Sequence, residues 1–67
     1  MKYKIRALRV GSGYKQGEFA KEVGISRAYL RLIEIGKAQN INKKIMISIA
    51  QKLNSTVQEL FFSDEEV

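Results

Sequence analysis

The stretch that decides the fold is QGEFAKEVGISRAYLRLIE, residues 16–34. It contains two short helical patterns, residues 16–23 and residue 27 to about residue 35, with a break between them. Gly24 in the break suits the left-handed conformation that commonly ends a helix. Ser26 is a favourable N-cap, because its hydroxyl can accept a backbone N–H of the following turn. The sequence therefore predicts two consecutive helices joined by a tight turn.

The apolar residues of this stretch predict how the two helices pack. Phe19, Ala20 and Val23 are spaced for one face of the first helix. The small side chain of Ala20 would let the second helix cross the first closely, while Leu30 and Ile33 dock the second helix and leave its other face free. Two helices joined by a few residues around a glycine are the signature of a helix-turn-helix.

A further helix is expected before this motif. Residues 2–10 carry Ile5 and Leu8 on one helix face, with Ala7 and Val10 as further candidates for that face. Glycines after this segment supply the turn that ends the helix.

Two more helices are expected after the motif. Asn42 can cap a helix over residues 43–53, and Thr56-Val57-Gln58-Glu59 is a capping box for a last short helix that ends near Phe62. The apolar residues recur at helical spacing, so we predict an all-α fold of five helices without strands. The expected core consists of Phe19, Leu30, Ile33, Ile45, Ile49 and Leu53.

Length and composition exclude several classes of function. The 67 residues are enough for one small domain, and they include no Cys and no His. Histidine, the commonest metal ligand and general base, is therefore missing. Glu18 and Glu22 stand one helical turn apart, but beside Lys21 they are typical of a solvated helix face. We expect no enzymatic activity, no metal and no cofactor.

The charge of the chain is unevenly distributed. The net charge is +5, but all 12 basic residues and only three of the seven acidic ones lie in residues 1–58, which gives that part +9. Such a basic body favours a polyanionic partner, and nucleic acid is preferred over a membrane surface. No apolar run is long enough to cross a membrane, and residues 1–10 lack the apolar run of a signal peptide. A cytoplasmic location is expected.

Residues 16–37, QGEFAKEVGISRAYLRLIEIGK, resemble the helix-turn-helix of the lambda-repressor-like, or Cro/C1-type, DNA-binding regulators. The matching residues are Gln16, Phe19, Ala20, Val23, Gly24, Ile25, Leu30, Ile33, Glu34, Gly36 and Lys37. The resemblance extends over roughly residues 4–62. It implies a compact five-helix domain over residues 1–62 that binds double-stranded DNA sequence-specifically as a transcriptional regulator, a repressor in our interpretation. We expect residues 63–67 to form a short acidic disordered tail.

The resemblance also implies which residues contact DNA, because the family places its third helix in the major groove. Base contacts would come from Ser26, Arg27, Ala28, Arg31 and Leu32. Phosphate contacts would come from Arg9, Lys15, Gln16, Lys37, Gln39, Asn40, Asn42 and Lys43. Arg9 is also expected to pair with Glu34 and to tie the first helix to the third. At Lys15 the family usually has Ser or Thr, and the lysine adds a positive charge.

Helical geometry predicts much of the same outer face. At 100° per residue, with Leu30 and Ile33 toward the core, the opposite face holds Ala28, Arg31, Leu32 and Ile35, and Arg27 lies on one flank. Arginine reads guanine through O6 and N7, and apolar side chains contact thymine methyl groups. We therefore expect binding sites that contain guanine and thymine. The alternative is that the two arginines only make this face soluble.

The C-terminal end favours a homodimer. Val57, Leu60, Phe61 and Phe62 form an apolar end that is rich for a core of this size to bury. The alternative is that Leu60 and Phe61 close the core of the monomer while Phe62 folds back.

One other function stays open, an antitoxin-like or adaptor protein that binds a protein partner as well as DNA. A membrane-surface peptide is disfavoured, since the basic residues are spread over several short helices. No ligand-binding domain is attached, so no small-molecule ligand is expected.

Overall fold

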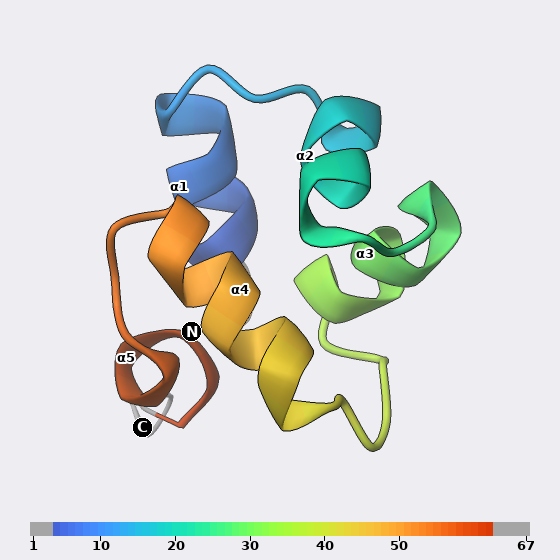
Figure 1. Ribbon diagram of the computed structural model, residues 1–67, viewed down its shortest axis with the longest axis vertical. Helices are drawn as coiled ribbons and strands as arrows, with labels where there is room; N and C mark the ends of the chain where they lie inside the picture. Colours follow the sequence, from blue (N-terminus) through green and yellow to red (C-terminus); the bar gives the residue numbers. More distant parts are fainter. Residues whose placement is uncertain (1–3, 63–67) are drawn as a thin grey trace.

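The computed structural model describes residues 4–62, and within them it contains five helices and no strand (Figure 1). The helices are α1 (Lys4–Gly11), α2 (Gln16–Val23), α3 (Arg27–Glu34), α4 (Lys43–Lys52) and α5 (Val57–Phe61). The predicted all-α class is confirmed, and the helices lie where the sequence predicted them, with ends that differ by one or two residues. Residues 63–67, which we expected to form an acidic tail, lie outside the described part.

Side-chain caps begin three of the helices at the predicted positions. Ser26, Asn42 and Thr56 each accept a hydrogen bond from a backbone N–H two or three residues further on, at 3.0, 2.7 and 3.1 Å respectively. The first N–H groups of a helix have no partner within the helix, and a cap that binds one of them contributes about 1 kcal/mol. These three residues therefore fix where α3, α4 and α5 begin.

The start of α2 is stabilised from within the helix. The side chain of Lys15 has no acceptor atom, but its backbone N–H donates to the carboxylate of Glu18 at 3.1 Å. This bond is one half of a capping box, and a carboxylate in the first turn also interacts favourably with the helix dipole. Gln16 is consequently held as the first residue of α2.

The turn between α2 and α3 depends on Gly24. Its φ is 90°, in the left-handed region that residues with a Cβ rarely adopt. The N–H groups of Gly24 and Ile25 both donate to the carbonyl oxygen of Ala20 at 2.9 Å. They close the end of α2, and the chain then reverses into the cap of α3 within a few residues.

The core is shared by all five helices. Phe19, Leu30 and Ile49 are completely buried at its centre. The buried apolar residues are Ile5, Phe19, Ala20, Leu30, Ile33, Ile49, Ala50, Leu53 and Leu60. Of the predicted core residues, Ile45 lies at the edge and is only partly buried. The expected core is otherwise confirmed.

One expectation for α1 is wrong. Ala7 and Val10 are exposed, and the inward face of α1 consists of Ile5, Leu8 and Arg9. Arg9 is buried because its charge is satisfied by Glu34 of α3 and by the carbonyl oxygen of Tyr14 in the loop after α1. Hydrophobic spacing alone could not place an arginine on the inner face.

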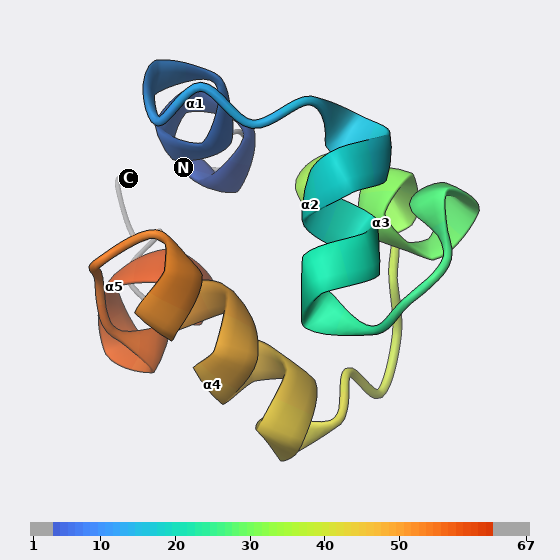
Figure 2. The same ribbon diagram turned by 45° about the horizontal axis from the view of Figure 1, so that its top comes forward.

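The helices form one compact bundle. α2 packs against both α3 and α4, α5 packs against α4, and α1 packs against α3. Figures 1 and 2 show α2 and α3 together on one side, α1 and α5 on the other, and α4 running between them. The loop over residues 35–42 leads from α3 to the start of α4. No helix within residues 4–62 is long and apolar enough to span a membrane.

Candidate nucleic-acid interface

The outer face of α3 is free for a partner. Ser26, Arg27, Ala28, Arg31 and Leu32, the five predicted base contacts, are all exposed. Leu30 and Ile33 hold the opposite face in the core. Tyr29 packs against the core and is partly buried.

A buried ion pair joins α1 to α3. Arg9 and Glu34 are 6% and 1% exposed, and their Nε and Oε2 atoms lie 2.6 Å apart. A second bond joins Arg9 Nη2 to Glu34 Oε1 at 3.2 Å, while Arg9 Nη1 donates to the carbonyl oxygen of Tyr14 at 2.9 Å. The pair predicted from the family resemblance is confirmed. Because the Arg9 side chain is buried and donates inside the protein, we drop Arg9 from the expected phosphate contacts.

Gln16 connects this buried pair with the outer face of α3. Its Nε2 donates to Glu34 Oε1 at 3.2 Å, and its Oε1 accepts from Arg27 Nε at 3.3 Å. The bond to Glu34 fixes which end of the amide faces Arg27. Sequence reasoning assigned Gln16 a phosphate contact and missed both bonds. No spacing rule relates residues 11 and 18 positions apart, so no sequence pattern could have found them.

The remaining candidates for phosphate contacts lie at helix starts and in one loop. Lys15 and Gln16 begin α2, while Asn42 and Lys43 begin α4. Lys37, Gln39 and Asn40 are exposed in the loop between α3 and α4. The N-terminus of a helix carries partial positive charge and free N–H groups, which favour phosphate.

The starts of α3 and α4 break the usual charge preference of helices, as does the start of α1. α3 begins with Arg27 and α4 with Lys43 and Lys44, and neither has an acidic residue in its first turn. Cations at the N-terminus of a helix interact unfavourably with the helix dipole, so this arrangement does not stabilise the fold of the isolated domain. Departures from local rules of this kind are expected at functional sites. Here they add positive charge where an anion could bind.

The acidic residues leave this positive charge uncompensated. Three carboxylates form the ion pairs Lys4–Glu59, Arg9–Glu34 and Lys52–Glu22. The fourth within residues 4–62 belongs to Glu18, which binds a backbone N–H. No ion pair in the described part of the chain involves the exposed cations near α3, namely Lys15, Arg27, Arg31, Lys37 and Lys43. We call these five cations, together with the exposed Ser26, Ala28 and Leu32 at the start and on the outer face of α3, the basic face.

Comparison with known proteins identifies the fold. A helix-turn-helix family model matches residues 5–60, which is most of the chain. The chain belongs to the Cro/C1-type helix-turn-helix family. It is thus a member of a family of DNA-binding transcription regulators, which is not a class of enzymes.

Two curated relatives of this regulator come from Archaeoglobus fulgidus, and both are described as uncharacterized HTH-type transcriptional regulators. They are 35% and 33% identical over 66 residues, which cover 98% of this chain and 93% and 92% of the relatives.

Solved structures show the same fold. The chain is similar to a protein in the SinR/SinI complex, with a TM-score of 0.81, 25% identity and coverage of 97% of this chain. It is also similar to the clp gene regulator ClgR from Corynebacterium glutamicum, with a TM-score of 0.76, 22% identity and 88% coverage. The regulator spans 63% and 62% of the lengths of those two chains.

The C-terminal residues expected to form a dimer interface lie in different environments. Leu60 is 8% exposed and belongs to the core, so its assignment to an interface is wrong. Val57 and Phe61 are partly buried against the core, while Phe62 is 60% exposed. The alternative for the monomer is confirmed for Leu60, which belongs to the core, and for Phe61, which packs against it, but Phe62 is exposed and does not fold back.

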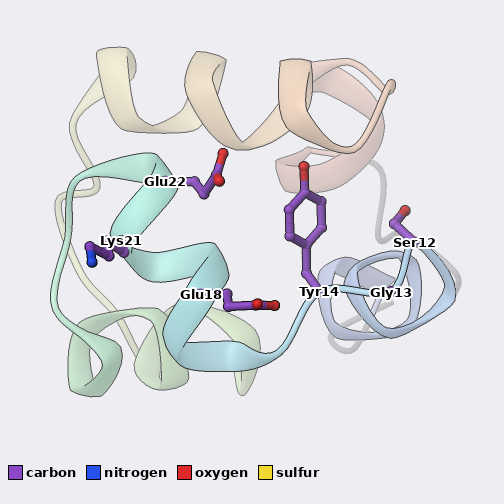
Figure 3. A pocket seen from close by; sticks show the side chains of 6 residues that line it. All are labelled: Ser12, Gly13, Tyr14, Glu18, Lys21 and Glu22. Carbon is purple, nitrogen blue, oxygen red and sulfur yellow. The ribbon is translucent and has the colours of Figure 1, made fainter.

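A hollow lies between the loop after α1 and one face of α2 (Figure 3). It is lined by Ser12, Gly13, Tyr14, Glu18, Lys21 and Glu22. Its two carboxylates have structural partners: Glu18 binds the backbone of Lys15, and Glu22 pairs with Lys52 at 3.1 Å. The interpretation of Glu18 and Glu22 as a solvated helix face is consistent with these contacts.

Proposed function

We propose that this regulator binds double-stranded DNA sequence-specifically and reads the major groove with α3. The observation that carries this proposal is the exposed row of Arg27, Ala28, Arg31 and Leu32 on a helix whose opposite face is anchored in the core. A half-buried helix with exposed arginines can enter a major groove about 12 Å wide without rearrangement.

The side chains of this row indicate the bases they would contact. Arg27 and Arg31 can each donate two hydrogen bonds to O6 and N7 of guanine. Ala28 and Leu32 have apolar surfaces, of which Leu32 is 41% exposed, and thymine methyl groups would cover them. Ser26 lies at the start of the helix, nearest to the edge of the groove.

Phosphates would be held on both sides of the groove. On one side we place Lys15 and Gln16, whose second amide hydrogen at Nε2 is available for a phosphate oxygen. On the other side we place Lys37, Gln39, Asn40, Asn42 and Lys43, at the loop and the N-terminus of α4. Contacts of this kind position a protein on the duplex, while base contacts supply the specificity.

We further propose that the regulator acts as a homodimer and as a repressor in the cytoplasm. One domain makes few base contacts, whereas a dimer reads two half-sites about 34 Å apart or a multiple of that distance. Val57, Phe61 and Phe62 supply apolar surface for a second copy. A dimer bound over a promoter would block polymerase without any further domain.

The test is selection of bound duplexes from a random DNA pool at about 150 mM salt, near physiological ionic strength. At this salt concentration, attraction to phosphates alone is weakened. We expect the wild-type chain to select a palindrome that contains guanine. We expect Arg27→Ala to lose the preference for one guanine in each half-site, by about 5-fold to 150-fold.

The absence of any selected motif, with binding that disappears as salt rises, would contradict sequence-specific recognition. The charge of the basic face would then have only a general affinity for polyanions.

A second candidate function is binding of a protein partner in addition to DNA. It is supported by the similarity to a protein that was solved as the SinR/SinI complex. A second protein that co-purifies with this chain in a stoichiometric ratio, and whose release increases DNA binding, would favour it.

A further inference from the structure

Gly17 stands at a position where the backbone does not require glycine. It lies in the first turn of α2, and its φ is outside the left-handed region that Gly13, Gly24 and Gly36 occupy. Glycine is among the poorest helix formers, since it loses the most conformational freedom on folding. The residue is also exposed, so no packing of the core excludes a side chain. Another reason for the glycine must be sought in its neighbours.

The neighbour of Gly17 is Arg27. A Cβ atom at residue 17 would lie 3.9 Å from Cδ of Arg27, the one contact within 4 Å that it would make. The apolar stem of Arg27 thus lies across the first turn of α2, over the place where other residues would carry a side chain. The Nε of the same arginine donates to Oε1 of Gln16 at 3.3 Å. Stem and guanidinium are both held on α2.

This placement determines which donors of Arg27 remain free. Because Nε is bound to Gln16, the Nη1 and Nη2 groups are left to face a partner. Two Nη groups side by side match the O6 and N7 acceptors of guanine in the end-on approach. Without the contact across Gly17, the long side chain would sample many rotamers and would lose entropy on binding a base.

We propose that Gly17 is a positioning residue that determines how Arg27 meets its base: a residue no larger than alanine at this position leaves the arginine stem its place on α2. The inference rests on the proposed function, since it concerns the DNA contact made by Arg27. It adds a specificity determinant on α2, outside the helix that contacts the bases.

The size of a side chain at residue 17 decides its effect. A single methyl group from Gly17→Ala would make an ordinary van der Waals contact with the Arg27 stem at 3.9 Å. Valine adds two γ-carbons, which fill two of the three staggered positions around Cβ. We expect a γ-carbon to compete with the stem for the same space, so that Gly17→Val displaces Arg27 and breaks its bond to Gln16.

The experiment repeats the duplex selection with the wild-type chain, Gly17→Ala, Gly17→Val and Arg27→Ala. The guanine whose preference is lost in Arg27→Ala defines the base that Arg27 reads. We expect Gly17→Ala to keep that preference and Gly17→Val to reduce it at least about fivefold, the lower end for one bidentate pair. Preferences at the other positions stay unchanged. A merely structural role for Gly17 would instead lower the affinity for all sequences alike.

A measurement without DNA tests the same contact and does not depend on the stability of one variant. The Nε–H of Arg27 in the free protein should show restricted motion in nitrogen-15 NMR relaxation. Arg31, one turn further on α3, is the internal control, because its exposed side chain makes no hydrogen bond or ion pair within residues 4–62 and should be mobile. Gly17→Val should make the Nε–H groups of Arg27 and Arg31 equally mobile, whereas Gly17→Ala should leave that of Arg27 more restricted than that of Arg31.

Two results separate this inference from the proposed function. If the wild-type chain selects a motif and Gly17→Val keeps the full preference for the guanine that Arg27 reads, the role of Gly17 is refuted. The proposal that the regulator reads bases would still stand. Equal mobility of Arg27 and Arg31 in the wild-type chain would refute it too. If the wild-type chain selects no motif, the proposed function fails and the inference fails with it.

Discussion

Glu34 links the stability of the domain to its basic face at the scale of single residues. Its carboxylate is almost completely buried and accepts hydrogen bonds from both Arg9 and Gln16, and Gln16 accepts from Arg27. A buried ion pair depends on both partners, because removal of one leaves an uncompensated charge inside the protein. Glu34 is therefore required for folding as well as for the position of Gln16.

We predict that Glu34→Ala lowers the free energy of unfolding by about 3–5 kcal/mol, since Arg9 would remain buried without its counter-charge. Urea denaturation followed by the helical circular dichroism signal measures the loss. The matched control is Glu22→Ala, which removes a pair with Lys52 whose side chains are 49% and 34% exposed. We expect that change to cost less than about 1 kcal/mol. Equal losses in the two variants would contradict the account.

The sequence predicts single residues to very different extents. The pair of Arg9 and Glu34 follows from the family resemblance, because it recurs at matching positions. The bonds of Gln16 do not follow from it, since they arise only when α2, α3 and the end of α1 are packed together. Leu60 was assigned to the surface because the apolar residues were counted without knowing how much surface the core could bury.

At the scale of elements, caps and glycines determine where the helices begin and end. Ser26, Asn42 and Thr56 each cap a helix through a side-chain oxygen, and Gly24 ends α2. These are short-range signals, which explains why the helix ranges were predictable to within one or two residues. The inner face of α1 was less predictable, because Arg9 replaces an apolar residue there.

We predict that Gly24→Ala destabilises the domain by about 1 kcal/mol or more, since a residue with a Cβ is strained at a φ of 90°. An added Cβ would meet no other atom within 4 Å, so the backbone conformation alone causes the loss. Gly11→Ala is the control, because Gly11 ends α1 without a positive φ and is equally open. Thermal unfolding of the two variants measures the difference. A Gly24→Ala variant as stable as Gly11→Ala would show that the turn does not require glycine at residue 24.

At the scale of the whole molecule, charge and apolar surface are separated. The exposed cations of the basic face lie at the start of α2, on α3, in the loop after α3 and at the start of α4, while Phe62 follows α5, which lies on the other side (Figure 1). This separation would let a second copy pack beside α5 while both basic faces remain free. The fold was predictable from the sequence, but the assembly depends on a surface that only a partner can define.

We predict that the wild-type chain is dimeric at micromolar concentration and that Phe62→Ser raises the dimer dissociation constant at least about tenfold, from the loss of one buried aromatic side chain. Sedimentation equilibrium measures the constant. Val10→Ser is the matched control, because Val10 is 58% exposed and lies near the end of α1, opposite to the end at which Lys4 pairs with Glu59 of α5. A monomeric wild-type chain would contradict the dimer, and equal effects of the two changes would place the interface elsewhere.

The most direct test of the central claim is binding to the selected duplex with 7-deazaguanine in place of guanine, one position at a time. This base lacks the N7 acceptor of the major groove but keeps its pairing and its minor-groove edge. Reading by Arg27 and Arg31 predicts that affinity falls at the guanines they contact, by a part of the about 5-fold to 150-fold that a whole bidentate pair is worth, since O6 is kept. Inosine, which lacks only the minor-groove amino group, should leave affinity unchanged. Loss with inosine and none with 7-deazaguanine would contradict major-groove reading by α3.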